Sequence, residues 1–425
     1  MFSSDAKLNF IDLFSGAGGL SEGFFQAGYN PIAHVDMDQY ACKTLETRSC
    51  YYYLRKENKL EIYYDYLCNR ISREELLRDI PQEVMQTVIC AEMSAKSIRG
   101  IFERIDRIIQ SDRIKKIDVI VGGPPCQAYS LVGRAQSNRM EVPMTEDPRN
   151  NLYLLYARFL KYYKPAMFVF ENVMGIESAN EGRTWSNIQK QLKRVGYKIE
   201  CREQNAYDFG VLQKRRRMIV IGWKKGSGLC YPKFEMFHSD TTVNELLKDL
   251  PKLKPGETKN RYRRTSPCDY VCENGLRTQD DVLTLHQSRP NTNQDIEIYK
   301  RAIKLWNKSK QRLKYNDLPD GLKTHRNRTS FSDRFKVVGG DLPYCHTILA
   351  HLSKDGHYFI HPDIMQHRSI TVREAARLQS FPDNYFFEGP RTSQFIQVGN
   401  AVPPLMAKTI AAEIYKQLCK EDSNV

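Results

Sequence analysis

The stretch "LNFIDLFSGAGGLSEGF", residues 8–24, sets the expected fold. It joins a short apolar run to a glycine-rich turn and then to the start of an expected helix. Glycines in such a turn let the backbone approach a ligand closely, and the start of a helix presents free N–H groups. The spacing Gly16-Ala17-Gly18-Gly19 differs from the G-x-G-x-x-G dinucleotide loop, and no Walker lysine follows. The turn alone is therefore a weak indication of a nucleotide site.

The same alternation of apolar runs and amphipathic stretches continues along the first half of the chain. Buried strands are expected at "NPIAHVD", "IDVIVGG" and "PAMFVFEN", and helices at "IRGIFERIDRIIQ" and "LYLLYARFLKYY". The segments "GYKIECREQNA" and "RRRMIVIGW" are typical of a closing strand pair. Strands that alternate with helices predict an α/β fold with a doubly wound, Rossmann-like sheet.

Composition changes along the chain predict how this fold is divided. Residues 1–224 are expected to form the main domain, with a tyrosine-rich, charged helical insertion at residues 48–86. Residues 225–367 lose the strand–helix alternation and begin with a stretch rich in Lys, Arg, Asn and Thr, which indicates a second, smaller domain. Residues 368–425 end in the amphipathic segment "PPLMAKTIAAEIYKQL", which is expected to return to the main domain.

Charge and cysteine usage narrow the class of protein. The 425-residue chain has a net charge of +14 and a pI near 9.1, which favours a polyanionic partner such as nucleic acid over a merely solubilising surface. The first residues lack the features of a secretory signal, and no apolar run approaches the roughly 18 residues of a membrane span. Eleven irregularly spaced cysteines suit a reducing cytoplasm and predict no metal site. We therefore expect a cytoplasmic protein without membrane contact.

The second predicted strand ends in "HVDMD", just over twenty residues past the glycine turn. Asp36 lies where a carboxylate would accept hydrogen bonds from ribose hydroxyls, and Met37 could lie on an adenine face. Together with the glycine turn, this position indicates a cofactor that carries a nucleoside.

A single cysteine stands out in "GGPPCQAYS", residues 122–130. Cys126 follows the end of a predicted strand, where ligands bind in such sheets, and two prolines stiffen the turn before it. A nucleophilic thiolate needs nearby cations, and Arg215 and Arg217 in "QKRRRM" would project to one face of a strand. An inert buried thiol is the alternative. A hydrolase nucleophile is another, although no histidine lies between His34 and His238 to assist it.

Six motifs in this order resemble those of the cytosine-C5 DNA methyltransferase family. "DLFSGAGGL" is similar to the family's first cofactor motif, "GGPPCQAYS" to its catalytic Pro-Cys motif, and "ENV" (171–173) to its glutamate motif. "QKRRR" (213–217) is similar to the basic motif, and "RSITVREAARLQSFPDNYFF" (368–387) and "QVGNAVPP" (397–404) to the last two motifs. The resemblance spans residues 10 to 404.

The resemblance implies an S-adenosylmethionine-dependent enzyme with a covalent mechanism. Cys126 would attack C6 of cytosine, Glu171 would bind N3 and the exocyclic amine, and Arg217, with Arg215, would hold O2. The cofactor residues it implies are Phe14, Ser15, Gly16, Ala17, Gly18, Gly19, Leu20, Asp36, Met37, Glu92, Pro124, Asn400, Ala401 and Val402. Glu92 is carried over from "CAEMS", which replaces the family's Gly-Asp-Ile, and the insertion at 48–86 blurs its register.

The implied substrate is double-stranded DNA, from which the target base must be extruded. Gln127, Ser130 and Arg134 lie in the polar stretch 127–148, an expected lid, and Thr347 in "HTI" resembles the Thr that supports the flipped nucleotide. Residues 225–367 would form the target-recognition domain of a bacterial, DNA-associated monomer paired with a restriction endonuclease. A transfer RNA methyltransferase of the same fold and a catalytically inactive DNA-binding relative are the alternatives.

Overall fold

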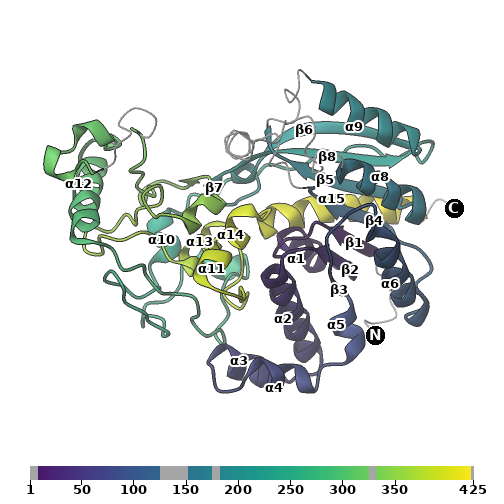
Figure 1. Ribbon diagram of the computed structural model, residues 1–425, viewed down its shortest axis with the longest axis horizontal. Helices are drawn as coiled ribbons and strands as arrows, with labels where there is room; N and C mark the ends of the chain where they lie inside the picture. Colours follow the sequence, from purple (N-terminus) through teal and green to yellow (C-terminus); the bar gives the residue numbers. More distant parts are fainter. Residues whose placement is uncertain (1–7, 125–151, 175–181, 325–331, 423–425) are drawn as a thin grey trace.

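The computed structural model describes residues 8–124, 152–174, 182–324 and 332–422. Within these ranges the core is one mixed seven-stranded sheet of order β3-β2-β1-β4-β5-β8-β6 (Figure 1). Its strands are β1 (Asn9–Leu13), β2 (Asn30–Asp36), β3 (Val88–Cys90), β4 (Val119–Gly122), β5 (Met167–Asn172), β6 (Tyr197–Asn205) and β8 (Arg216–Lys224). The predicted α/β sheet is therefore confirmed. Five strands are parallel, whereas β8 runs antiparallel to both β5 and β6.

Helices cover both faces of the sheet, which explains why its strands are apolar on both sides. On one face lie α1 (Gly19–Gln26) and the C-terminal α15 (Pro404–Asp422), packed on alternate strand residues such as Phe10 and Val121. The other face carries α6 (Ile98–Ser111), α8 (Leu152–Tyr163) and α9 (Arg183–Arg194), which pack on residues such as Ile11 and Ile120. The C-terminal helix thus completes the layer that begins with α1.

Four helices fill the chain between β2 and β3. They are α2 (Gln39–Lys56), α3 (Leu60–Leu67), α4 (Arg73–Arg78) and α5 (Gln82–Gln86). They share a small core of their own that includes Cys50, Leu54, Tyr63 and Leu76. In Figure 1 these four helices lie below the sheet, next to its edge strand β3.

The described residues between Lys224 and Val372 contain few regular elements and extend away from the sheet (Figure 1). Their helices are α10 (Val243–Leu247), α11 (Asp269–Glu273) and α12 (Asn293–Ser309). Short 3₁₀ turns occupy Ala206–Asp208, Tyr315–Asp317, Asp320–Leu322 and Ala350–Ser353. A two-stranded parallel pair, β7 (Gln213–Lys214) and β9 (Cys345–His346), ties this region to the segment that leads into β8.

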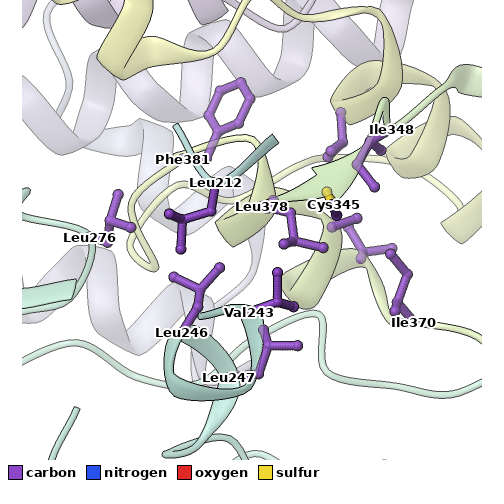
Figure 2. Close-up of a cluster of buried hydrophobic side chains, with 14 of the residues drawn as sticks. Leu212, Val243, Leu246, Leu247, Leu276, Cys345, Ile348, Ile370, Leu378 and Phe381 are labelled. Atoms are coloured by element: carbon purple, nitrogen blue, oxygen red, sulfur yellow. The ribbon is translucent and has the colours of Figure 1, made fainter. Parts of the chain in front are cut away.

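A second hydrophobic core joins the two parts of the molecule. Figure 2 shows Leu212 from the sheet side, Leu246 from α10, and Leu378 from α13 (Val372–Leu378) in one cluster. Beside this cluster, the fully buried Arg377 binds Asp249 at 2.5 Å and Asp383 at 2.6 Å. Helix α14 (Arg391–Asn400) then leads back to α15.

No helix within the described ranges is both long and apolar enough to cross a lipid bilayer.

Candidate active site at the carboxyl edge of the sheet

The candidate site residues follow the carboxyl ends of neighbouring parallel strands. Leu13 of β1 pairs with Val35 of β2 on one side and with Gly122 of β4 on the other, and Gly122 pairs with Phe170 of β5. The strands therefore end side by side, where open α/β sheets bind their ligands. The glycine turn, Asp36, Pro124 and Glu171 all lie at this edge.

The glycine turn after β1 is held by the end of β2. The Gly16 N–H donates to Asp36 Oδ2 at 2.7 Å, and the Ser15 N–H donates to the Val35 carbonyl at 3.1 Å. Asp36 Oδ1 accepts a further bond from the Asp38 N–H at 2.8 Å, and burial raises the pKa of Asp36. Because an ionised carboxylate has about four acceptor sites, Asp36 can still accept ribose hydroxyls.

Neighbouring residues pack so closely against Gly18 and Gly19 that side chains would not fit at these two positions. A Cβ on Gly19 would lie 2.2 Å from the Val402 carbonyl oxygen and 3.0 Å from Ala401 Cβ, and one on Gly18 would lie 2.9 Å from the Tyr385 hydroxyl. Helix α1 has no side-chain cap, so its first N–H groups are available to the carboxylate of an amino acid. The backbone cradle therefore fits the methionine end of S-adenosylmethionine.

The adenosine end is expected along β2 and β3. Met37 directly follows β2 with 67% of its surface exposed, which leaves an apolar side chain free to cover a base. The Ala91 N–H donates to the Asp36 carbonyl at 2.8 Å, so the exposed Glu92 lies beside the end of β2. The insertion made the pairing of this segment uncertain in the sequence. In the structure Cys90 pairs with Asp36, which places Glu92 near Asp36 and Met37.

The remaining cofactor candidates differ in what they can offer. Leu20 is buried in the core beneath α1, so a ligand would meet its backbone rather than its side chain. Phe14 is half-buried with a positive φ of 57°, and Pro124 is buried at the end of β4. Asn400 is exposed at the end of α14, next to Ala401.

A buried polar cluster lies beneath the glycine turn. Ser21 donates to Asp12 Oδ2 at 2.5 Å and lies 2.9 Å from His34 Nδ1. Burial raises the pKa of Asp12 to about 7, against the lowering effect of the Ser21 hydrogen bond, and burial lowers the pKa of His34 to about 4. Asp12 Oδ1 has no partner among the described residues. The sequence analysis did not single out this cluster.

An ion pair joins β5 to β8 beside Gly123. Glu171 Oε1 lies 2.7 Å from Arg217 Nε, and their side chains are 15% and 14% exposed. A Cβ on Gly123 would lie 2.9 Å from both Glu171 Oε2 and the Glu171 carbonyl oxygen. Only a glycine lets the chain that leads to Cys126 pass this close to the carboxylate.

The structure separates the two arginines that the sequence analysis grouped together. Arg215 is fully buried and donates to the carbonyls of Ile348 at 2.8 Å and Gly399 at 3.1 Å, whereas Arg217 contacts Glu171. Arg215 thus binds two backbone segments behind the site.

Thr347 is held beside the basic motif. Gln213, which was not predicted as a site residue, helps to hold the segment that contains Thr347. Thr347 Oγ1 donates to the Lys214 carbonyl at 2.7 Å. The buried Gln213 accepts from the Ile348 N–H at 2.8 Å and donates to the Leu378 carbonyl at 3.0 Å. Its place in the motif "QKRRR" was the available signal. The backbone of Ile348 is therefore bound on both sides: Gln213 accepts from its N–H, and Arg215 donates to its carbonyl.

Four predicted residues lie outside the described residues. These are the nucleophile Cys126 and the lid residues Gln127, Ser130 and Arg134.

Comparison with known proteins identifies the family. A family model described as C-5 cytosine-specific DNA methylase matches residues 8–64 and 89–416. The chain belongs to this family. It is therefore a DNA (cytosine-5-)-methyltransferase, and its methyl donor is S-adenosylmethionine. This excludes the thiol hydrolase and transfer RNA alternatives.

Similar proteins share nearly the whole length of this methyltransferase. The type II methyltransferase M.Bpa9945I of Bacillus paralicheniformis is 42% identical, over 95% of this chain and 98% of its own. The type II methyltransferase M.DdeI of Desulfomicrobium norvegicum is 32% identical, over 96% and 88%. A candidate DNA modification methyltransferase encoded within an E. coli prophage shares the fold, with a TM-score of 0.62 and 23% identity over 97% of this chain and 100% of its own.

Proposed function

We propose that this methyltransferase is the modification enzyme of a type II restriction–modification system, with Cys126 as its nucleophile. The observation that carries the site assignment is the Glu171–Arg217 pair beside Gly123, three residues before Cys126. The two curated relatives named above are type II methyltransferases, which supports the biological role. A cognate endonuclease would act on the same DNA site.

The chemistry follows from what cytosine lacks. C5 is a poor nucleophile until the Cys126 thiolate bonds to C6 and makes the ring enamine-like. Glu171 accepts a hydrogen bond from the exocyclic amine and delivers a proton to N3, which neutralises the negative charge that develops there, while Arg217 holds O2. S-adenosylmethionine, when bound, supplies the methyl group that C5 takes up. Loss of the C5 proton to a base then breaks the C6–sulfur bond and restores the thiolate.

Residues at the ends of different strands would bind different parts of the cofactor. The Ser15–Gly19 turn and the start of α1 would hold the amino-acid end, and Asp36 would bind the ribose. Phe14, Met37 and Glu92 would contact the adenine. Pro124 and the residues Asn400, Ala401 and Val402 would close the site around the donor.

Residues 225–367 are assigned to target recognition. Thr347 would support the flipped nucleotide, because its hydroxyl is fixed beside the basic motif. In this assignment Gln127, Ser130 and Arg134 contact the DNA backbone or fill the space that the extruded base leaves. Arg215 and Gln213 would position Thr347 through Ile348 rather than touch the base.

Bisulfite sequencing of DNA from cells that express the chain tests this proposal. Cytosines protected at one short recurring sequence, with no protection in cells that express Cys126→Ser, would support it. Protection that persists in the Cys126→Ser variant would contradict the assignment of the nucleophile. To test the biological role, an endonuclease encoded beside the gene should cut unmodified DNA at that same sequence.

A further inference from the structure

The helical insertion contains a segment that the family model does not match, beginning directly after Tyr64. The family model matches residues 8–64 and 89–416, so residues 65–88 fall outside it. These unmatched residues include the end of α3 and all of α4 and α5. The shared catalytic fold therefore gives no account of what this part of the chain does.

Helix α3 presents three tyrosines to residues far along the chain. Their hydroxyl groups donate to three acceptors: Tyr63 to the Asn384 carbonyl at 2.7 Å, Tyr64 to Asp281 Oδ1 at 2.9 Å, and Tyr66 to Glu388 Oε1 at 2.8 Å. Asn384 and Glu388 lie between α13 and α14, whereas Asp281 belongs to the residues assigned to target recognition. Tyr64 thus links the insertion to that region.

Asp281 is a buried junction between three parts of the molecule. Its Oδ1 also accepts from Asn384 Nδ2 at 3.0 Å, and its Oδ2 accepts from the Thr278 N–H at 2.7 Å. Val282 packs against the insertion's own core. Because a buried carboxylate that loses a donor keeps its desolvation cost, the Tyr64 hydroxyl is expected to matter more than a surface hydrogen bond would.

Asp281, which accepts from the Tyr64 hydroxyl, lines a groove between the insertion and the recognition region. The groove has a volume of about 890 Å³ and is lined by residues 67–70 of the insertion on one side and by residues 258–262 on the other. Asp281 and Val282 also line it. The Tyr64–Asp281 hydrogen bond and the packing of Val282 therefore connect the insertion to the recognition region beside this groove.

We propose that the insertion positions the recognition region, with Tyr64 acting through Asp281 to fix residues 278–286 against the catalytic domain. This inference rests on the proposed assignment of residues 225–367 to target recognition. A recognition region held in place before DNA arrives does not lose conformational freedom when it binds, which favours affinity for DNA. Within the described part of the chain, neither Tyr64 nor Asp281 hydrogen-bonds to the residues at the sheet edge, so the rate of the methyl-transfer step is expected to stay unchanged.

A matched pair of single-hydroxyl deletions tests the proposal in the full-length enzyme. Tyr64→Phe removes the bond to Asp281, and Tyr53→Phe removes a hydroxyl from another half-buried tyrosine in the same insertion core. With an unmethylated duplex that carries the recognition sequence, Tyr64→Phe should raise KM for DNA by about tenfold and leave kcat within about twofold. Hydrogen exchange in residues 278–286 should become faster in Tyr64→Phe and stay unchanged in Tyr53→Phe.

A double-mutant cycle with Asp281→Ala, which removes the acceptor of the Tyr64 hydroxyl, shows whether the two residues act together. Strongly non-additive effects on KM are expected, because each single variant breaks the same bond. Additive effects, an unchanged KM and exchange rate in Tyr64→Phe, or a loss of kcat and melting temperature at constant KM would each overturn the proposal. If the wild-type chain methylates no DNA, the proposed function fails. The rate of hydrogen exchange in residues 278–286 then decides by itself whether Tyr64 fixes this segment.

Discussion

Arg217 Nε lies 2.7 Å from Glu171 Oε1, and the two residues come from neighbouring antiparallel strands of the same sheet. The contact fixes the carboxylate at the point where the chain passes from β4 toward Cys126. A half-buried carboxylate held in this way can bind the amidine edge of a cytosine without first rearranging.

Removing either partner of this pair should lower the rate of methyl transfer. Glu171→Gln and Arg217→Ala are each expected to reduce kcat by about 10²- to 10³-fold, because each removes a group aimed at charge that develops on the base. Single-turnover methylation of a labelled duplex measures this rate. The control is Arg216→Ala, whose exposed side chain pairs with Glu203, and its rate should stay close to that of the wild type. Equal losses in all three variants would contradict the assignment.

Gly123 should tolerate no side chain. In Gly123→Ala the new methyl group would lie 2.9 Å from Glu171 Oε2, so either the carboxylate or the Pro-Cys segment must move. We expect a loss of kcat of at least about tenfold with binding of S-adenosylmethionine retained, measured by calorimetry. Gly100→Ala is the control, because a Cβ there meets nothing within 4 Å and alanine suits the first turn of α6. A fully active Gly123→Ala enzyme would show that the close approach is unimportant.

Stability should depend on pH through Asp12. Its folded pKa of about 7 is above the unfolded value near 4, so the folded state binds the extra proton between these values. This proton makes its full contribution to the free energy of unfolding below about pH 4. As the pH rises to about 7 the contribution is lost, which lowers the free energy of unfolding by up to about 4 kcal/mol. Asp12→Asn should remove this loss, so that melting temperatures of the variant fall less than those of the wild type between pH 5 and 8. Parallel curves for the two proteins would contradict the prediction.

Gln213 should matter for base extrusion although it lies behind the site. Gln213→Leu keeps the volume but leaves the buried Ile348 N–H without its acceptor, at an expected cost of about 1–3 kcal/mol in unfolding free energy. Because Ile348 follows Thr347, the fluorescence of a 2-aminopurine placed at the target position should rise less on binding than with the wild type. A wild-type fluorescence change would separate Gln213 from the positioning of Thr347.

The strand ends could be predicted because each is marked by local sequence. Apolar runs end at Asp36, Gly122 and Glu171, and a parallel sheet brings such ends to one edge. Strand β3 (Val88–Cys90) was not predicted, because three apolar residues after a long insertion give no periodic signal. The helix α12 was also missed, although its capping box at Thr292 and Asp295 was present in "TNQD".

The pairing inside the site could not be derived from the sequence. Arg215 and Arg217 have the same parity along the chain, yet one is fully buried between backbone carbonyls and the other meets Glu171. The difference arises because β7 (Gln213–Lys214) pairs with β9 (Cys345–His346), more than 130 residues away, just before β8 begins. Long-range pairing of this kind leaves no local pattern, so the burial of Gln213 and Arg215 is visible only in the structure.

The most direct test is to trap the enzyme on a duplex in which the target base is 5-fluorocytosine, with S-adenosylmethionine present. Fluorine at C5 cannot leave as a proton, so the bond between sulfur and C6 persists. Peptide mapping by mass spectrometry then shows which of the eleven cysteines carries the base. An adduct on the peptide that contains Cys126, absent in Cys126→Ser, is the predicted result. An adduct on another cysteine, or a methylating enzyme that forms none, would contradict the account.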